Sequence, residues 1–239
     1  MSAYSKLIFG RVAKNLRLLT FSALVVLLTL PMPASAHRPV WGETLGPTQV
    51  DNIVTSYAYY QTLQAAEIDI LFFDGLKGQK FHAGIQIPDL AAYQDYTVSM
   101  ALFGPDLPKV AYDQLPPEHP EGLGALIAPS VIGDDFFEPF TQTNFLGRQS
   151  LDTELPADGT YYLLIWNGNG AAGKYVVDIG YEEVFGATDL LVFPIWWLRV
   201  HWYFEHYLLI GALASPVVLV IARLRRRALR TSTSASPSA

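Results

Sequence analysis

The sequence predicts an all-β domain, an antiparallel β-sandwich of jelly-roll type, followed by one C-terminal transmembrane α-helix. Three observations predict this organisation. Apolar and polar residues alternate in short runs, turns rich in glycine, proline and aspartate separate those runs, and one long uncharged stretch near the C-terminus ends in arginines. Alternation with period two is typical of strands, and about 20 apolar residues allow a helix to cross a bilayer.

The N-terminal segment has the pattern of a signal peptide. Basic residues precede an apolar run from Leu18 to Leu30, and Ala34-Ser35-Ala36 follows as a small-x-small cleavage site. Cleavage there leaves His37 as the mature amino terminus, whereas an uncleaved anchor is the alternative. The domain boundaries we expect are a signal peptide at 1–36, an extracytoplasmic sandwich at 37–184, a juxtamembrane interfacial segment at 185–204, a transmembrane helix at 205–222 and a basic cytoplasmic tail at 223–239.

Period-two runs between residues 37 and 184 mark the expected strands. Three such runs lie at 67–73, 80–87 and 97–102. The run at 160–166 is apolar on both faces, so we expect a central strand there. A turn rich in Gly and Asn then leads to a returning strand whose core-facing residues are Tyr175, Val177 and Ile179. Two sheets are expected, because a single sheet would leave one apolar face exposed to water.

The uncharged stretch Tyr207–Ala222 predicts the membrane span, and hence the bilayer as a partner. Aromatic residues gather before it and arginines after it, and arginine clusters stay cytoplasmic. We therefore expect a single-pass protein of the cell membrane with its N-terminal domain outside the cytoplasm. The expected anchoring residues are Trp196, Trp197, Trp202, Arg223, Arg225, Arg226 and Arg227.

The segment before the span is expected to be an interfacial helix. Pro194 has no N–H to donate and suits a first helical turn. Trp196, Trp197, Val200 and Tyr203 would share one face, which suits a helix lying in the headgroup layer or docked under the sandwich. We expect a bend near Glu205 and His206, where the interfacial segment joins the span.

The charge distribution restricts the partners. All 22 acidic residues lie between Glu43 and Glu205, against seven basic ones, so the exported part has a formal charge of −15. Such a domain repels nucleic acid and attracts cations or a basic partner, although acidity also serves solubility. Because the sequence contains no cysteine, a hydrophobic core rather than disulfides must stabilise the domain.

Two stretches resemble known bacterial proteins. Pro156–Ile165 followed by Gly173–Gly180 is similar to the closing hairpin of pre-peptidase C-terminal (PPC) domains, which are small β-sandwiches appended to secreted proteins. The layout also resembles an uncharacterised group of membrane-anchored extracytoplasmic proteins, with a Gly104–Pro108 loop, a Phe137–Phe140 segment and a juxtamembrane Pro-x-Trp-Trp. The resemblance to PPC domains implies a role in adhesion or substrate targeting rather than in catalysis.

An acidic and aromatic loop is the candidate contact surface. Phe136, Phe137, Glu138 and Phe140 form it, and its rings either contact a partner or cover one open end of the sandwich. Long loops on β scaffolds often carry binding residues. The expected partner is a protein or a glycan outside the cytoplasm.

The sequence shows no nucleophile elbow, phosphate loop or zinc-protease helix, so we expect no enzymatic activity. His37 is the histidine with a special position. As a mature amino terminus it offers an amine and an imidazole, a pair of nitrogen ligands that suits copper. His82 or Glu43 could complete the site. The expected function is therefore that of a non-enzymatic binding module, which could be accessory to a membrane complex. A copper-binding protein is the alternative.

Overall fold

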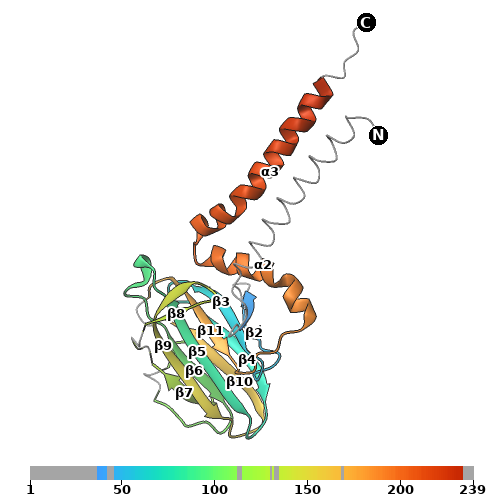
Figure 1. Cartoon of the computed structure of the whole chain (residues 1–239). Helices are drawn as coiled ribbons and strands as arrows, with labels where there is room; N and C mark the ends of the chain where they lie inside the picture. Colours follow the sequence, from blue (N-terminus) through green and yellow to red (C-terminus); the bar gives the residue numbers. More distant parts are fainter. Residues whose placement is uncertain are drawn as a thin grey trace. The chain divides into compact units, whose positions relative to one another are not determined.

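The computed structural model describes residues 37–41, 46–111, 115–129, 131, 135–167 and 170–233. The expected signal peptide and Glu43 lie outside these residues. The chain divides into two compact units, Pro33–Trp197 and Met1–Met32 with Leu198–Ala239. Strands make up most of the first unit, and two helices follow them (Figure 1).

The described strands form two mixed sheets. In spatial order, the first sheet consists of β1 (Arg38–Trp41), β3 (Tyr57–Leu63), β11 (Gly173–Ile179), β5 (Lys80–Pro88), β9 (Thr143–Glu154) and β8 (Phe136–Glu138). The second sheet consists of β2 (Thr48–Gln49), β4 (Ile68–Gly75), β10 (Gly159–Trp166), β6 (Ser99–Gly104) and β7 (Gly124–Ala128). A short 3₁₀ turn, η1, spans Ala91–Tyr93. As predicted, β10 has a neighbour on each side.

The expectation of purely antiparallel sheets is wrong at two edges. β1 pairs with β3 in parallel, and β2 pairs with β4 in parallel. The chain alternates between the sheets from β1 to β4, so each of these parallel pairs joins strands two steps apart along the chain.

The predicted hairpin between β10 and β11 is also wrong. β10 lies in the second sheet between β4 and β6, whereas β11 lies in the first sheet between β3 and β5. The connection therefore crosses from one sheet to the other. The Asn167 side chain donates a hydrogen bond to the Ala171 carbonyl across this connection, at 2.7 Å.

One hydrophobic core is shared by the two sheets. Phe73 of β4 stacks on Phe81 of β5 with ring centroids 4.9 Å apart, and Tyr161 stacks on Phe73 at 5.6 Å. The predicted inward residues of β11 belong to this core: Tyr175, Val177 and Ile179 are fully buried. Alternate residues of β5 and β11 therefore point away from the core, onto the outer face of the first sheet.

Helix α2 (Ala187–Tyr203) begins earlier than expected. Pro194 lies inside it rather than in its first turn. The start is instead stabilised by Asp189, whose carboxylate accepts a hydrogen bond from Gly186 N–H at 2.8 Å and pairs with Arg38 at 2.5 Å. An acidic side chain at a helix N-terminus also interacts favourably with the helix dipole.

Helix α3 (Tyr207–Thr233) follows α2 after a short break that contains Glu205 and His206. Its segment Tyr207–Arg226 is long and apolar enough to cross a membrane, judged by length and composition. The helix continues beyond the expected end at residue 222 and carries the arginines with it. Arg223, Arg225 and Arg226 are exposed.

Candidate functional site

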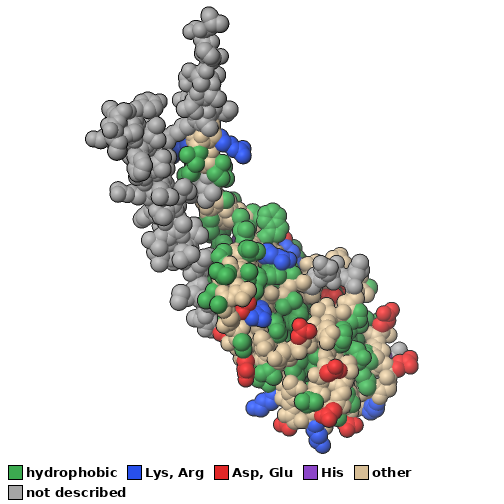
Figure 2. All heavy atoms as spheres, turned by 90° about the vertical axis from the view of Figure 1, so that its right-hand side faces the viewer, with side chains coloured by type: hydrophobic (Ala, Val, Ile, Leu, Met, Phe, Trp, Pro, Cys, Tyr) green, Lys and Arg blue, Asp and Glu red, His purple; other side chains and the backbone are tan. Residues whose placement is uncertain are grey.

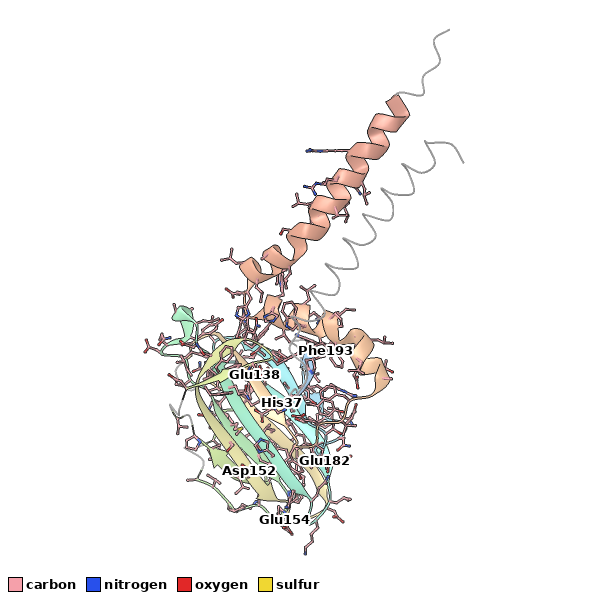
Figure 3. All side chains as sticks on the ribbon, in the orientation of Figure 1. His37, Glu138, Asp152, Glu154, Glu182 and Phe193 are labelled. Atoms are coloured by element: carbon pink, nitrogen blue, oxygen red, sulfur yellow. The ribbon has the colours of Figure 1, made fainter. Side chains whose placement is uncertain are left out.

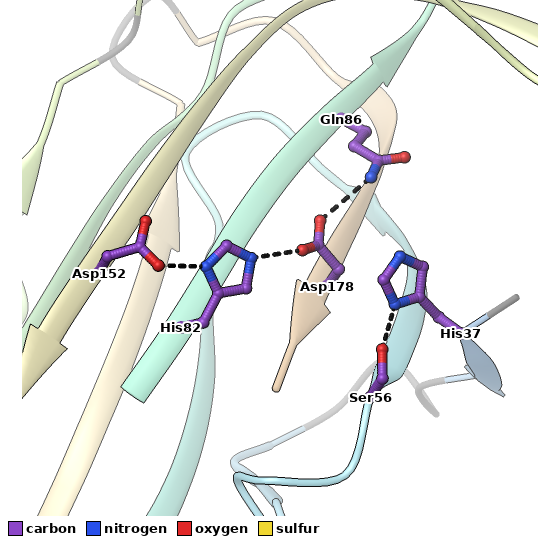
Figure 4. Close-up of polar contacts among 6 residues, drawn as sticks. All are labelled: His37, Ser56, His82, Gln86, Asp152 and Asp178. Atoms are coloured by element: carbon purple, nitrogen blue, oxygen red, sulfur yellow. Dashed lines mark hydrogen bonds and ion pairs between the residues drawn. The ribbon is translucent and has the colours of Figure 1, made fainter. Parts of the chain in front are cut away.

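Three charged side chains meet on the outer face of the first sheet. His82 of β5 lies opposite Asp152 of β9 in the strand register, and Asp178 of β11 lies opposite Gly84 of β5. His82 Nδ1 is 2.6 Å from Asp152 Oδ1, and its Nε2 is 3.0 Å from Asp178 Oδ2 (Figure 4). One imidazole therefore bridges two carboxylates from the two neighbouring strands.

Gly84 provides the space for the Asp178 carboxylate. A Cβ at Gly84 would lie 2.7 Å and 2.9 Å from the two Asp178 oxygens, closer than a carbon and an oxygen can approach. Gln86 Nε2 donates a further hydrogen bond to Asp178 Oδ1 at 3.1 Å. The Asp178 carboxylate thus lies over the backbone of β5 and receives hydrogen bonds from residues on both sides of Gly84.

The electrostatics of this cluster favour a protonated His82. The hydrogen bond to Asp178 is the largest cause that raises the pKa of His82 to about 9, against the lowering effect of burial and with help from Asp152. Burial raises the pKa of Asp178, but the His82 hydrogen bond and the nearby His37 and His82 leave it below its usual value. At neutral pH the cluster therefore contains an imidazolium between two carboxylates.

His37 lies beside the same cluster. Its Nδ1 contacts Ser56 Oγ, and the backbone N–H of Arg38 donates to the Ser56 carbonyl at 2.9 Å. The parallel pairing of β1 with β3 sets this position. Figure 4 shows the His37 ring on the side of Asp178 that faces away from His82.

His37, His82 and Asp178 line a pocket of about 530 Å³. His37, His82, Gln86 and Asp178 contribute from the first sheet, and the segment Phe136–Pro139 contributes from β8 and the turn after it. Figure 3 labels His37 and Glu138, two of the lining residues. The pocket therefore brings together the two expected metal ligands and part of the expected contact loop.

The four expected contact residues have different environments. Phe136 stacks on Phe145 with centroids 5.4 Å apart, and Phe140 is buried against Phe193 of α2 at 5.3 Å. Glu138 accepts hydrogen bonds from the backbone N–H groups of Phe140 and Thr141 at 3.0 Å and 2.5 Å. Phe137 is 57 % exposed. Exposed ring surface for a partner is thus found at Phe137, whereas Phe140 belongs to the packing.

The expected metal ligands are close together but not equivalent. Both ring nitrogens of His82 face carboxylates, so His82 would have to lose a proton and a partner before it could bind a metal. No group of three or more His, Cys, Asp or Glu side chains is arranged to hold a metal within the part of the chain that the structure describes.

The expected anchoring tryptophans also differ. Trp202 is 63 % exposed, Trp196 is partly buried, and Trp197 is only 6 % exposed. The side chain of Arg227 lies outside the described residues. The apolar face that α2 exposes consists of Leu191, Ile195, Leu198 and Trp202, which are 46 % to 81 % exposed. Trp197 and Val200 were expected to share a face that lies in the headgroup layer or docks under the sandwich, and both of these side chains are buried.

Sequence reasoning missed the roles of Asp152 and Asp178. His82 was considered as a possible metal ligand, and its two partners lie 70 and 96 residues away along the chain. One feature of the sequence could have indicated this cluster. Asp178 lies in the apolar run Tyr175–Ile179, and a carboxylate among apolar residues needs a hydrogen-bond or charge partner.

No protein-family model matches the chain, and no curated protein matches it. Several solved structures are similar to it. PliG from Salmonella Typhimurium, a periplasmic inhibitor of g-type lysozyme, has 20 % identity and a TM-score of 0.32, covering 57 % of this chain and 98 % of PliG. The pre-peptidase C-terminal domain of a Bacillus anthracis collagenase has 9 % identity and a TM-score of 0.35, covering 57 % and 96 %. CorA, a surface-associated copper-binding protein of Methylomicrobium album BG8, has 10 % identity and a TM-score of 0.33, covering 58 % and 98 %. At these scores the similarity identifies neither the family nor the function of the chain.

Proposed function

We propose that the chain is a non-enzymatic binding module, a PPC-like β-sandwich held at the outer face of the cell membrane by α3. The observation that carries the proposal is the pocket of about 530 Å³, which assembles His37, Asp178 and the Phe136–Pro139 segment from three distant parts of the chain. A pocket with a few convergent polar groups is the usual form of a binding site.

The chemistry of the pocket favours a basic partner surface. Phe137 supplies an exposed ring that a cationic side chain can stack on. Figure 2 shows acidic side chains spread over the β domain, in line with the charge of −15 counted from the sequence. A protein with basic residues, or a glycan with amino groups, therefore fits this face better than nucleic acid does.

The membrane attachment rests on two helices. Segment Tyr207–Arg226 has the length and composition of a span. Leu191, Ile195, Leu198 and Trp202 recur with helical spacing along α2, and all four are exposed. Helix α2 ends at Tyr203, and the span begins at Tyr207, so the end of α2 must lie at the membrane surface. The exposed apolar face of α2 is therefore suited to the headgroup layer.

Site-specific photo-crosslinking in intact cells tests the pocket. A photoreactive phenylalanine analogue replaces Phe137 in one strain and Leu76, which is 66 % exposed on the β4–β5 turn, in another. We expect a discrete adduct from position 137 and none from position 76. The same adducts from both positions, or none from position 137, would refute the pocket as the partner site.

Copper binding is the second candidate, and the observation that favours it is the placement of His37 in this pocket. After cleavage behind Ala36, the His37 amine and Nδ1 could chelate Cu(II) together. Nδ1 contacts Ser56 Oγ in the structure, so the ring would have to turn away from Ser56 to do so.

Calorimetry separates this candidate from the first. The mature protein that starts at His37 should bind one Cu(II) more tightly than the same protein with one extra residue before His37, because that residue converts the amine into an amide. Ser56→Ala should leave the Cu(II) affinity unchanged or increase it, because the substitution removes the hydroxyl group that contacts His37 Nδ1. Equal affinities with and without the extra residue would exclude the His37 site.

A further inference from the structure

The last turn of α2 has an unusual residue at its end. His206 N–H donates to the His201 carbonyl at 2.9 Å, and Glu205 N–H donates to the Trp202 carbonyl at 3.1 Å. This pair of bonds is a Schellman motif, in which the residue after the helix adopts a left-handed conformation. Glycine is usual at that position, but here it is Glu205, with φ of 64°.

The motif folds His206 back over His201. An apolar contact commonly joins these two positions of a Schellman motif. Here the contact joins two imidazoles, with ring centroids 5.1 Å apart and the two Nδ1 atoms 2.8 Å apart. Strained backbone that brings polar side chains together is a recurring feature of functional sites.

The two Nδ1 atoms lie within hydrogen-bond distance of each other. The Nδ1 atom of an imidazole either carries a proton or offers a lone pair. The pair can therefore share one proton, or the two lone pairs can bind one metal ion.

The spacing of the Nδ1 atoms matches a metal with right-angled coordination. Imidazole nitrogens lie about 2.0–2.1 Å from a bound metal, so two of them at a right angle are about 2.9 Å apart, whereas a tetrahedral angle would separate them by about 3.3 Å. The observed 2.8 Å agrees with the right angle. Square-planar or tetragonal nitrogen and oxygen coordination is characteristic of Cu(II).

We propose that His201 and His206 form a two-imidazole site for Cu(II) where α2 ends, with Nδ1 of each ring as a ligand. The site shares no residue with the pocket on the first sheet and does not depend on the proposed function. One ligand, His201, lies in the last turn of α2 and the other, His206, lies in the break after it, and the backbone bonds that end α2 hold them together.

The test uses the full-length protein in lipid nanodiscs, with His37→Ala as the background so that the amino-terminal candidate does not contribute. Cu(II) alone is added, and its binding is followed by calorimetry and by electron paramagnetic resonance. We expect one Cu(II) per chain with nitrogen hyperfine structure from two imidazoles. His206→Phe keeps an apolar contact at this position but removes a ligand, and it should weaken binding at least tenfold.

Two control variants separate ligand loss from misfolding. Glu205→Gly relieves the left-handed residue and keeps both histidines, so it should bind Cu(II) as the background does. His119→Ala removes a histidine whose Nδ1 lies 2.9 Å from the Pro116 carbonyl, and it should also bind normally. Unchanged Cu(II) affinity in His206→Phe would overturn the proposal, and so would loss of the two-nitrogen signal in either control.

Discussion

At the scale of single residues, the His82 cluster depends on one glycine. The Asp178 carboxylate occupies the space that a side chain at position 84 would fill. Asp178 is only 6 % exposed, so its charge relies on His82 and Gln86 for hydrogen bonds. A buried carboxylate without such partners is strongly unfavourable.

Gly84→Ala should therefore lower the pKa of His82. The new methyl group forces the Asp178 carboxylate away from Nε2, and the hydrogen bond that contributes most to the raised pKa of about 9 is lost or lengthened. Histidine NMR titration of the full chain in detergent measures the change. Gly186→Ala is the matched control, because its added Cβ meets nothing closer than an ordinary contact of 3.7 Å. An unchanged His82 titration in Gly84→Ala would contradict the geometry.

The same cluster predicts how stability depends on pH. The folded pKa of His82 is about 9, above the ordinary value of 6.5, so its contribution is complete below pH 6.5 and declines as the pH rises through 9. The pKa of Asp178 is lowered, so its contribution is present above its ordinary pKa of 3.8 and is lost as the pH falls below that value. Between pH 6.5 and 9.5 we expect the unfolding free energy to fall by roughly 1–3 kcal/mol. The lower part of this range allows for solvent, which screens the interaction of His82 with the exposed Asp152.

Urea unfolding of the full chain in mild detergent, followed by near-ultraviolet circular dichroism at several pH values, measures this fall. His82→Gln keeps a side chain that can donate one hydrogen bond but does not titrate. Its stability should be flat across the alkaline range. An equally steep fall in His82→Gln would assign the effect to other groups.

At the scale of elements, β10 is the centre of the second sheet. Leu163 and Ile165 are fully buried, and both lie in the core that the two sheets share. Leu163→Ala should lower the unfolding free energy by about 2–5 kcal/mol, because it removes buried methyl groups and leaves a cavity. Leu76→Ala, at a residue that is 66 % exposed, should change it by less than about 0.5 kcal/mol. Equal urea midpoints for the two variants would place the core elsewhere.

Helix α2 presents two different tryptophan environments. Trp202 lies on the exposed apolar face, whereas Trp197 is buried. In variants that keep a single tryptophan and carry Phe at the other four positions, quenchers attached to lipid should dim Trp202 emission strongly and Trp197 emission weakly. Trp202 emission that responds to aqueous iodide and not to the lipid quencher would place the helix away from the membrane.

At the scale of the whole molecule, the charge pattern predicts the orientation in the membrane. Arginines follow the apolar segment, and the acidic β domain precedes it. Protease added to the outer face should digest the β domain and leave a protected C-terminal fragment of roughly 4 kDa, the mass of one span with its tail. Protection of the β domain from external protease would reverse the proposed orientation.

The sequence by itself determined the local structure of this protein. Alternation of apolar and polar residues located β4, β5, β6, β10 and β11, because the side chains of a strand point to opposite faces in turn. It did not locate β3 or β9. The run Tyr161–Trp166 marked a central strand for the same reason, since both of its faces are apolar. The uncharged stretch from Tyr207 predicted a helix that could span a membrane, and the expected break at Glu205 and His206 lies between α2 and α3.

Only the tertiary structure decided which distant residues meet. A glycine-rich turn permits a hairpin or a crossing between sheets, so β10 and β11 could not be assigned to different sheets from local pattern. The contacts of His82 with Asp152 and Asp178 depend on the register of three strands, and a shift of one residue would turn these side chains to the other face. Likewise, the sequence predicted Trp197 and Trp202 to be membrane-anchoring residues alike. In the structure Trp197 is buried and Trp202 is exposed, which depends on the packing of α2. Local preference is a property of neighbouring residues, whereas register and burial are set by the free energy of the whole packed chain.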